Sequence, residues 1–321
     1  MGLRSIIPVL VMMALSQSLF AQRAPGHYSK EISFTTENDN YLLQKRDGYY
    51  TNGFYFSFQH LAGIKKRSAG KVIMRYELGQ MIFNPYKYSI TDPEQMDRPF
   101  AGYLFVKASR SGFFSNEANL QYGLSAGILG KPSGAEQTQR VYHDLINIYK
   151  VEGWDYQLKD EFGLNIHAQY THPVTGELRR GSGLDLNAIV KASAGNTFTN
   201  GVAGLLLRIG LLEKPSQSVA WSSRLHREQA GYFRKSEFFI FYQPEVMLQV
   251  YNATLQGGLF RSDKGPVRAE LQPWLYQHRM GLMFAQDRCS IIFAVVHRTR
   301  EARGMRRKEN YGSVQLAYRF Y

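Results

Sequence analysis

The feature that most constrains the fold is an alternation of apolar with polar or small residues, which recurs along the chain. The segment 54–59 reads FYFSFQ, and the segment 164–171 reads LNIHAQYT. A period of two puts successive side chains on opposite faces of a β-strand. Beyond the first residues, the chain has no run of eighteen apolar residues, so it predicts no transmembrane helix. We therefore expect strands with one lipid-facing and one polar side.

Twelve segments follow this pattern, and an even number is typical of a single-chain bacterial barrel. The predicted strands are Lys30–Asn38, Tyr50–Gln59, Val72–Ile82, Phe100–Arg110, Asn119–Ile128, Gln157–Tyr170, Gly183–Ala194, Gly201–Leu211, Phe238–Tyr251, Arg268–Phe284, Arg288–Thr299 and Gly312–Phe320. The predicted fold class is all-β, a transmembrane antiparallel β-barrel of about 12 strands. One predicted inner connection, Leu212–Glu237, is long for a periplasmic turn, which indicates either an extra element or a miscounted strand.

The N-terminus has the order of a secretory signal peptide. Arg4 gives a positive start, Ile6–Leu15 is an apolar run too short to span a bilayer as a helix, and Ser16–Ala21 ends on a small residue. We therefore predict a signal peptide over residues 1–21 and one barrel domain over residues 22–321. With the strand pattern, this places the chain in the outer membrane.

Composition narrows the partners. Aromatic residues make up 14% of the chain, which suits the aromatic girdles at the two membrane interfaces. The single cysteine, Cys289, excludes an intramolecular disulfide framework. The net charge of +13 is spread along the chain without a local cluster, so we expect no nucleic-acid partner. An anionic partner at the membrane surface, such as lipopolysaccharide phosphates, is the natural expectation.

The third predicted outer loop, residues 129–156, carries one helix. Ser133 and Glu136 have the spacing of a capping box at its start. One face of the helical wheel is apolar, and it is made of Val141, Tyr142, Leu145, Ile148 and Tyr149. The opposite face is polar, and it is made of Glu136, Gln139, Arg140, His143 and Asn147. Gln139 and His143 are four residues apart, so their side chains are neighbours.

Three polar clusters fall at the same predicted rim of the barrel, residues 37–40, 50–53 and 98–102, with His143 on its helix above them. By strand parity, Thr51 is expected to point inward. Each cluster also has a structural explanation, because Asn and Asp at a strand end usually serve a turn. A single histidine on a helix is likewise more often structural than catalytic. The functional interpretation gains weight because the three clusters and His143 are all predicted at the same rim of the barrel.

The motifs resemble those of the outer-membrane lipid A 3-O-deacylase family. The resemblance begins near Glu31 and extends to the end of the chain. The matching motifs are Glu37-Asn38-Asp39, Tyr50-Thr51-Asn52-Gly53, Asp97-Arg98-Pro99-Phe100-Ala101-Gly102, Gln139 with His143, Gly153-Trp154-Asp155-Tyr156-Gln157-Leu158, Tyr251-Asn252-Ala253-Thr254-Leu255-Gln256-Gly257 and Tyr311–Phe320. Each motif is short, but their order and their spacing fit a barrel.

The resemblance implies a twelve-stranded barrel that acts on lipid A, the membrane anchor of lipopolysaccharide, with its active site facing the exterior. It implies calcium-dependent hydrolysis of an ester-linked acyloxyacyl chain, in which a histidine activates water and Ca²⁺ stabilises the oxyanion. Transferred by motif, His143 is the general base, and Asn38 and Asp39 hold calcium. Thr51 is a metal ligand or a water-positioning group.

Two further roles follow from the same resemblance. Gln139 orients beside His143, and Arg98 binds an anionic headgroup or supports the site. The partner of the imidazole stays open, because Asp144 lies about 100° around the helix from it. Asp155 and a backbone carbonyl are both possible partners.

Two other functions compete with lipid A hydrolysis. A non-enzymatic pore or adhesin would use the rim clusters as turns and the helix as a plug or receptor contact. An outer-membrane phospholipase would need an inward serine beside a histidine on adjacent strands, and the sequence offers no such pair near the rim. We expect a monomer, because single-barrel enzymes can act as monomers, and the sequence leaves the oligomeric state open. The accepted acyl-chain length and the need for a phosphate on the substrate are left open by the sequence.

Overall fold

The computed structural model describes residues 27–42, 48–62, 70–87, 89–145, 147, 149–175, 183–226 and 236–321. The predicted signal peptide lies outside these residues. The strands are β1 (Lys30–Asn38), β2 (Tyr49–Leu61), β3 (Lys71–Asn84), β4 (Ala101–Phe113), β5 (Asn119–Leu129), β6 (Glu161–Pro173), β7 (Leu184–Gly195), β8 (Phe198–Leu211), β9 (Ser236–Asn252), β10 (Trp274–Gln286), β11 (Cys289–Arg298) and β12 (Glu309–Phe320).

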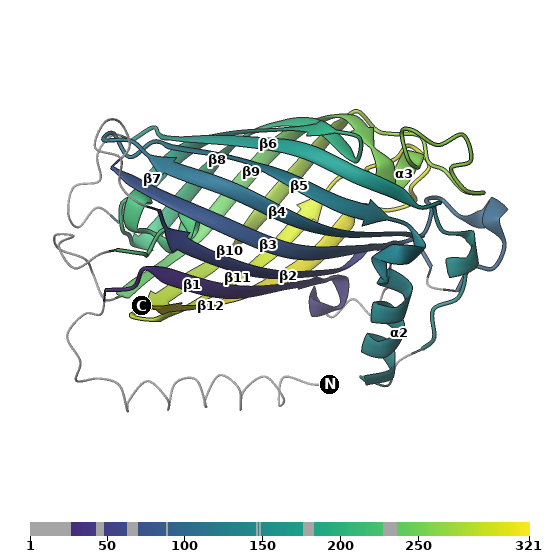
Figure 1. Cartoon of the computed structure of the whole chain (residues 1–321), viewed down its shortest axis with the longest axis horizontal. Coiled ribbons are helices and arrows are strands. Elements are labelled where there is room, and N and C mark those ends of the chain that lie inside the picture. The colour runs from purple at the N-terminus through teal and green to yellow at the C-terminus, as the bar shows by residue number, and fades with distance from the viewer. Residues whose placement is uncertain are drawn as a thin grey trace.

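The twelve strands form one closed antiparallel barrel, in which each strand pairs with its neighbours in sequence and β1 pairs with β12 (Figure 1). This confirms the predicted fold class. The predicted bounds of β1 are reproduced, whereas β6 begins four residues later than predicted, at Glu161. Among the described residues, no helix has the length and apolar character needed to span a bilayer.

The alternation of side chains sets the two faces of the wall. In β2, Phe56 is 58% exposed on the outside of the barrel. Its neighbour Ser57 is buried on the lumen side, where its hydroxyl donates to Glu77 on the adjacent strand β3. Phe56 lies in register with Phe34 of β1 and Leu78 of β3, which are also on the outside. Exposed apolar side chains continue around the other strands, so the outer face has the apolar band that a bilayer requires.

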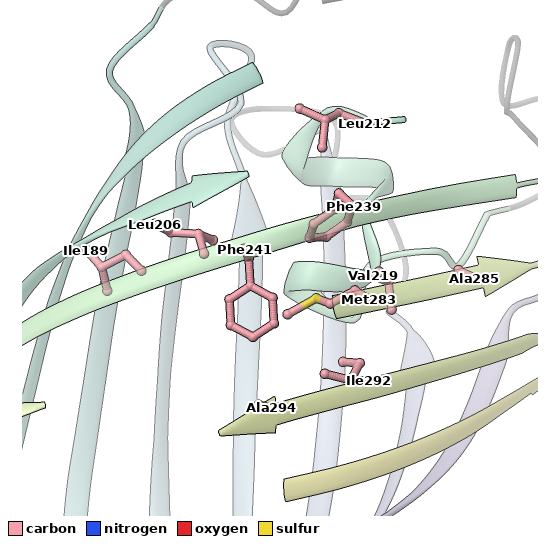
Figure 2. Close-up of a cluster of buried hydrophobic side chains, with 10 residues drawn as sticks. All are labelled: Ile189, Leu206, Leu212, Val219, Phe239, Phe241, Met283, Ala285, Ile292 and Ala294. Carbon is pink, nitrogen blue, oxygen red and sulfur yellow. The ribbon is translucent and has the colours of Figure 1, made fainter. Parts of the chain in front are cut away.

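On one side of the barrel, side chains fill the lumen. Inward side chains of β7 to β11 form an apolar cluster together with the connection between β8 and β9 (Figure 2). In Figure 2, Val219 on a helical turn of that connection faces Phe239 and Met283 on the strands. Trp221 and Ala220 pack against the same cluster. The long connection that the sequence left unexplained is therefore an extra element, which we call the plug segment, residues 212–226.

Buried polar contacts hold the plug segment to strands around the barrel. Glu237 of β9 accepts hydrogen bonds from Ser218 Oγ at 2.7 Å and from the backbone N–H of Val219 at 2.8 Å. The same carboxylate pairs with Arg208 and Arg224, and all three side chains are fully buried. On the opposite wall, Lys71, Gln59 and Arg75 bond the backbone or side chains of residues 216–223. The segment therefore lies across the lumen at this end.

The other end of the barrel carries the two α-helices, and we call it the helix-bearing rim. It holds α2 (Ala135–Leu145), α3 (Ala253–Gln256) and the short 3-10 helix Asp39–Leu42. Figure 1 shows α2 and α3 together at this end, whereas the start of β1 and the chain's C-terminus lie at the opposite end. All three polar clusters singled out in the sequence lie at the helix-bearing rim.

Candidate active site

A row of four residues runs across the outer face of the wall at the helix-bearing rim. Asn38 of β1 is in register with Asn52 of β2, Asn52 with Ile82 of β3, and Ile82 with Gly102 of β4. Their parity is that of the outward residues, but all four are buried. Another part of the chain therefore covers the wall at this height.

The cover is the third loop, which folds down onto the outside of the barrel. A Cβ at Gly102 would lie 2.1 Å from Ser133 Oγ and 2.2 Å from Ala135 Cβ, so only glycine allows this approach. Gln80 Nε2, also on the outer face, donates to the Ser133 carbonyl at 2.7 Å. Further along α2, the ring of Tyr142 lies 6.4 Å from that of Phe54. Helix α2 thus packs against the outer wall over β2, β3 and β4.

Asn38, Asp39 and Thr51 meet in one corner of this covered region. Thr51 Oγ1 donates to Asp39 Oδ1 at 3.5 Å, and the Gly48 backbone N–H donates to Asp39 Oδ2 at 2.9 Å. Asn38 Nδ2 donates to Asn52 Oδ1 at 2.5 Å. All of these side chains are buried, so the corner is a dense group of carboxylate, amide and hydroxyl oxygens.

A bulge places Thr51 in this corner. The pairing of β2 with β3 skips Thr51, since Tyr50 pairs with Phe83 and Asn52 with Ile82. Tyr50 therefore takes the inward position, where its hydroxyl donates to Glu37 Oε2 at 2.6 Å. Thr51 is the bulged residue, so the alternation on which the prediction of an inward Thr51 rests is interrupted at this position.

Helix α2 buries two of its polar side chains. Gln139 is fully buried and accepts a hydrogen bond from Trp154 Nε1 at 2.9 Å, and His143 is 2% exposed. By contrast, Val141 and Leu145 are 68% and 81% exposed. The two predicted faces are therefore only partly reproduced. Arg140 of the polar face is exposed, Tyr142 of the apolar face packs beside Phe54, and Ile148 lies outside the described residues. The apolar side chains of Val141 and Leu145 point away from the protein. This orientation suits a helix beside a bilayer, where the outward face meets lipid or substrate rather than water.

A backbone carbonyl contacts the imidazole of His143. Nδ1 of the imidazole lies 2.8 Å from the carbonyl oxygen of Tyr149, and the two rings meet edge to face at 5.3 Å. A carbonyl only accepts, so Nδ1 carries a proton and donates it. In the neutral ring, the lone pair is then on Nε2. Of the two alternatives left by the sequence, this contact selects the carbonyl over Asp155. The orientation of the ring thus depends on the loop that follows α2.

The predicted capping box does not form. Ser133 Oγ donates to the carbonyl of Gly130 at 2.6 Å, and the residue before α2 is Gly134 in the left-handed region at φ 67°. Glu136 instead pairs with Arg140 one turn later at 2.7 Å. Ser133 belongs to the turn Lys131–Ser133 and does not cap α2. The loop bends sharply at this turn, which brings α2 against Gly102.

Arg98 lies apart from this corner, inside the mouth of the barrel. Its guanidinium stacks over Phe83 at 4.5 Å and lies within 3.6 Å of carboxylate oxygens of Glu301 and Glu309. It also donates to Thr254 at the start of α3. Burial lowers the pKa of Arg98, which the two acidic partners oppose. Of the two predicted roles, the contacts favour support of the rim, because a fully buried side chain offers no donor to a lipid headgroup.

Two asparagines at this site received no role from the sequence. Asn52 Nδ2 is buried without a hydrogen-bond partner, and both polar atoms of Asn84 are likewise buried and unsatisfied. Asn84 is in register with Tyr49, next to the bulge. Buried amides are normally hydrogen-bonded, so an unsatisfied pair marks a place where a further group fits. Asn52 belonged to a recognised motif, whereas Asn84 follows a strand end with no distinguishing pattern.

Comparison with known proteins identifies the family. The model of the family described as "Outer membrane protein LpxR" matches residues 6–320. The chain belongs to the LpxR family. This confirms the resemblance drawn from the motifs and the outer-membrane location of the barrel. No curated protein sequence matches the chain.

Two solved structures were compared with the chain. LpxR from Salmonella typhimurium superposes with a TM-score of 0.72 at 17% sequence identity, over 90% of this chain and 100% of that one. The translocator domain of the autotransporter NalP from Neisseria meningitidis gives a TM-score of 0.45 at 10% identity, over 99% of this chain and 96% of that one. The likeness to the Salmonella protein shows a shared barrel fold.

Proposed function

We propose that this protein hydrolyses an ester-linked acyloxyacyl chain of lipid A in the outer leaflet of the outer membrane. The observation that carries the proposal is the covered row on the outer wall of the barrel. A lipid in the bilayer approaches a barrel from outside, so a site for lipid chemistry belongs on this face rather than in the lumen. Membership of the LpxR family and the matching motifs support the same substrate.

His143 is the proposed general base. With its Nδ1 proton directed to Tyr149, Nε2 holds the lone pair that takes a proton from a water molecule. The hydroxide equivalent adds to the ester carbonyl. Collapse of the tetrahedral intermediate breaks the bond to the sugar oxygen, which leaves as a hydroxyl with the proton returned by the imidazolium. Gln139 positions α2 by its bond to Trp154 and thereby the histidine one turn away.

Calcium is the proposed cofactor, and the oxygens in the corner suit it. Ca²⁺ prefers carboxylate, amide and hydroxyl or water oxygens. Asp39, Asn38 and Thr51 supply these donor types side by side, and the amides of Asn52 and Asn84 lie next to them. Asn84 Oδ1 is a buried oxygen with no hydrogen-bond partner among the described residues. We propose that Asp39, Asn38 and Thr51 hold the ion, with the neighbouring amides in support. When bound, it stabilises the negative charge that develops on the ester carbonyl oxygen.

The alternative function as a pore receives no support from the lumen. The plug segment and the apolar cluster of Figure 2 occupy the end opposite to the helices. At the helix-bearing rim, Arg98, Glu301 and Glu309 are buried across the mouth. Buried contacts of this kind at both ends are typical of a barrel whose lumen is filled by its own side chains.

The proposal is tested by lipid A mass spectrometry on cells that express the protein with calcium supplied. We expect a new species that is lighter by one acyloxyacyl unit and carries a free sugar hydroxyl. Cells with the empty vector serve as the control. An unchanged lipid A profile, with the folded barrel present in the outer membrane, would refute the proposed activity.

A further inference from the structure

A second polar feature lies at the helix-bearing rim, beside the corner that holds Asp39. It is a cleft of about 430 Å³ between the end of β1, the start of β2 and the connection from β11 to β12. Its lining includes Asp39, Tyr49, Arg300, Arg306, Arg307 and Lys308. Four cationic side chains therefore converge on a space that shares Asp39 with the candidate active site.

None of the four cations is neutralised by the residues that the structure describes. Arg300, Arg306 and Lys308 are exposed and Arg307 is half-buried, and no described carboxylate forms an ion pair with any of them. The carboxylate of Asp97 beneath the cleft is instead occupied by the Tyr49 hydroxyl at 2.6 Å and by backbone N–H groups. The cleft thus keeps a strong positive charge.

The connection that carries these cations is held in place. The Tyr49 hydroxyl accepts from the backbone N–H groups of Arg306 and Arg307, at 2.7 Å and 3.1 Å. Met305 and Ala302 are buried in the same apolar cluster as Tyr49. Fixing the backbone lowers the entropy that binding would otherwise lose, so the cleft is preorganised.

Two of the side chains are also oriented. The guanidinium of Arg306 lies 3.9 Å from the centre of the Tyr86 ring, and Arg307 donates to the Tyr86 carbonyl at 2.6 Å. Stacking fixes the plane of Arg306 but leaves its N–H groups at the edge available. An arginine fork presented in this way matches the paired oxygens of a phosphate.

We propose that this cleft binds a phosphate monoester of the glycolipid substrate. The inference rests on the proposed function, because Asp39 joins the cleft to the oxygen-rich corner and places a bound phosphate beside the ester to be cleaved. A phosphate on the disaccharide therefore orients the lipid headgroup for hydrolysis. The selectivity lies in the connection between β11 and β12 rather than in Arg98.

The first test is kinetic, in mixed detergent micelles with calcium. Lipid A with both phosphates is compared with lipid A that lacks one, for the wild type and for the double variant Arg306→Gln/Lys308→Gln. We expect the double variant to raise the apparent KM for the fully phosphorylated lipid about tenfold, equivalent to about 1.4 kcal/mol, with kcat nearly unchanged. One of the monophosphorylated lipids lacks the phosphate that the cleft recognises. On that lipid, the wild type and the double variant should have the same apparent KM.

Arg303→Gln is the matched control. Arg303 belongs to the same connection and is exposed, but it pairs with Glu270 outside the cleft. It should leave the apparent KM unchanged. An equal rise in KM for Arg303→Gln would attribute the effect to the general charge of the rim and overturn the proposal. A double variant with wild-type KM on the fully phosphorylated lipid would overturn it as well.

The second test measures binding without catalysis, so it remains valid if the proposed activity fails. Immobilised His143→Ala protein is exposed to lipid A micelles without calcium, with and without the two cleft substitutions. Retention should depend on Arg306 and Lys308 and on the lipid phosphate, and inorganic phosphate should compete only at much higher concentration. If inorganic phosphate displaced the lipid at a concentration equal to that of the lipid, the ligand of the cleft would be free phosphate. This result would contradict a site for the lipid headgroup.

Discussion

The ring nitrogen Nδ1 of His143 lies 2.8 Å from the carbonyl oxygen of Tyr149, across the end of helix α2. On the same helix, the buried side chain of Gln139 accepts a hydrogen bond from Trp154. The histidine that would act on water is therefore aligned by the carbonyl of Tyr149 and, through Gln139, by Trp154. We therefore predict that the position of the helix controls catalysis.

Gln139→Leu should loosen α2 and reduce activity through His143. The substitution leaves the buried N–H of Trp154 without an acceptor, which costs about 1–3 kcal/mol. We expect faster hydrogen exchange over residues 135–145 and a lower kcat, with the barrel intact. Gln139→Glu keeps an acceptor and should restore part of the protection. Equal exchange in the Leu and Glu variants would contradict a positioning role.

Gly102→Ala should displace the third loop from the wall. The added Cβ meets Ser133 and Ala135 at distances where atoms cannot remain, so the loop must move. We expect hydrolysis to fall at least about tenfold, while unheated gel migration still reports a folded barrel. Gly201→Ala is the control, because a Cβ there meets no atom within 4 Å. Full activity in Gly102→Ala would show that close contact at this point is not required.

Asp39→Asn should raise the calcium requirement. The amide keeps the size of the side chain but removes the charge that a divalent cation favours. We expect the calcium concentration for half-maximal activity to rise at least about tenfold. Asp92→Asn, at an exposed carboxylate that caps a rim turn, should leave it unchanged. Wild-type activity that is indifferent to chelator would remove the metal from the account.

Glu237→Ala should loosen the plug segment. It leaves Arg208 and Arg224 buried without this partner, and breaking such a buried pair costs about 3–5 kcal/mol. In planar bilayers we expect no stable conductance from the wild type and intermittent currents from the variant. Glu270→Ala, at an exposed ion pair, should resemble the wild type. Steady conductance by the wild type would favour a pore.

The barrel was predictable because its signal is repeated. Alternation that recurs over twelve segments fixes both the strand count and the facing of residues such as Phe56 and Ser57. Strand ends were less predictable, as for β10, which begins at Trp274 rather than at Arg268. The end of a strand depends on loop contacts that a period of two does not encode.

The site was predictable in its residue types but not in its geometry. The bulge at Thr51 leaves no trace in the alternation, and so its orientation could not be deduced from parity. The outward direction of Val141 on α2 was not predictable either, since the rule that apolar faces turn inward assumes water outside. Arg98 could not be assigned between its two roles, because its acidic partners lie about 200 residues later in the chain.

The central claim is that the outer wall beneath α2 is a hydrolytic site with His143 as its base. The most direct measurement is fatty-acid release from lipid A by purified wild type, His143→Ala and His278→Ala, each verified as a folded barrel. His278 is the control, because it bonds Tyr242 on β9, away from α2. We predict a loss of at least about a hundredfold for His143→Ala and wild-type rates for His278→Ala. Undiminished release by His143→Ala would contradict the account.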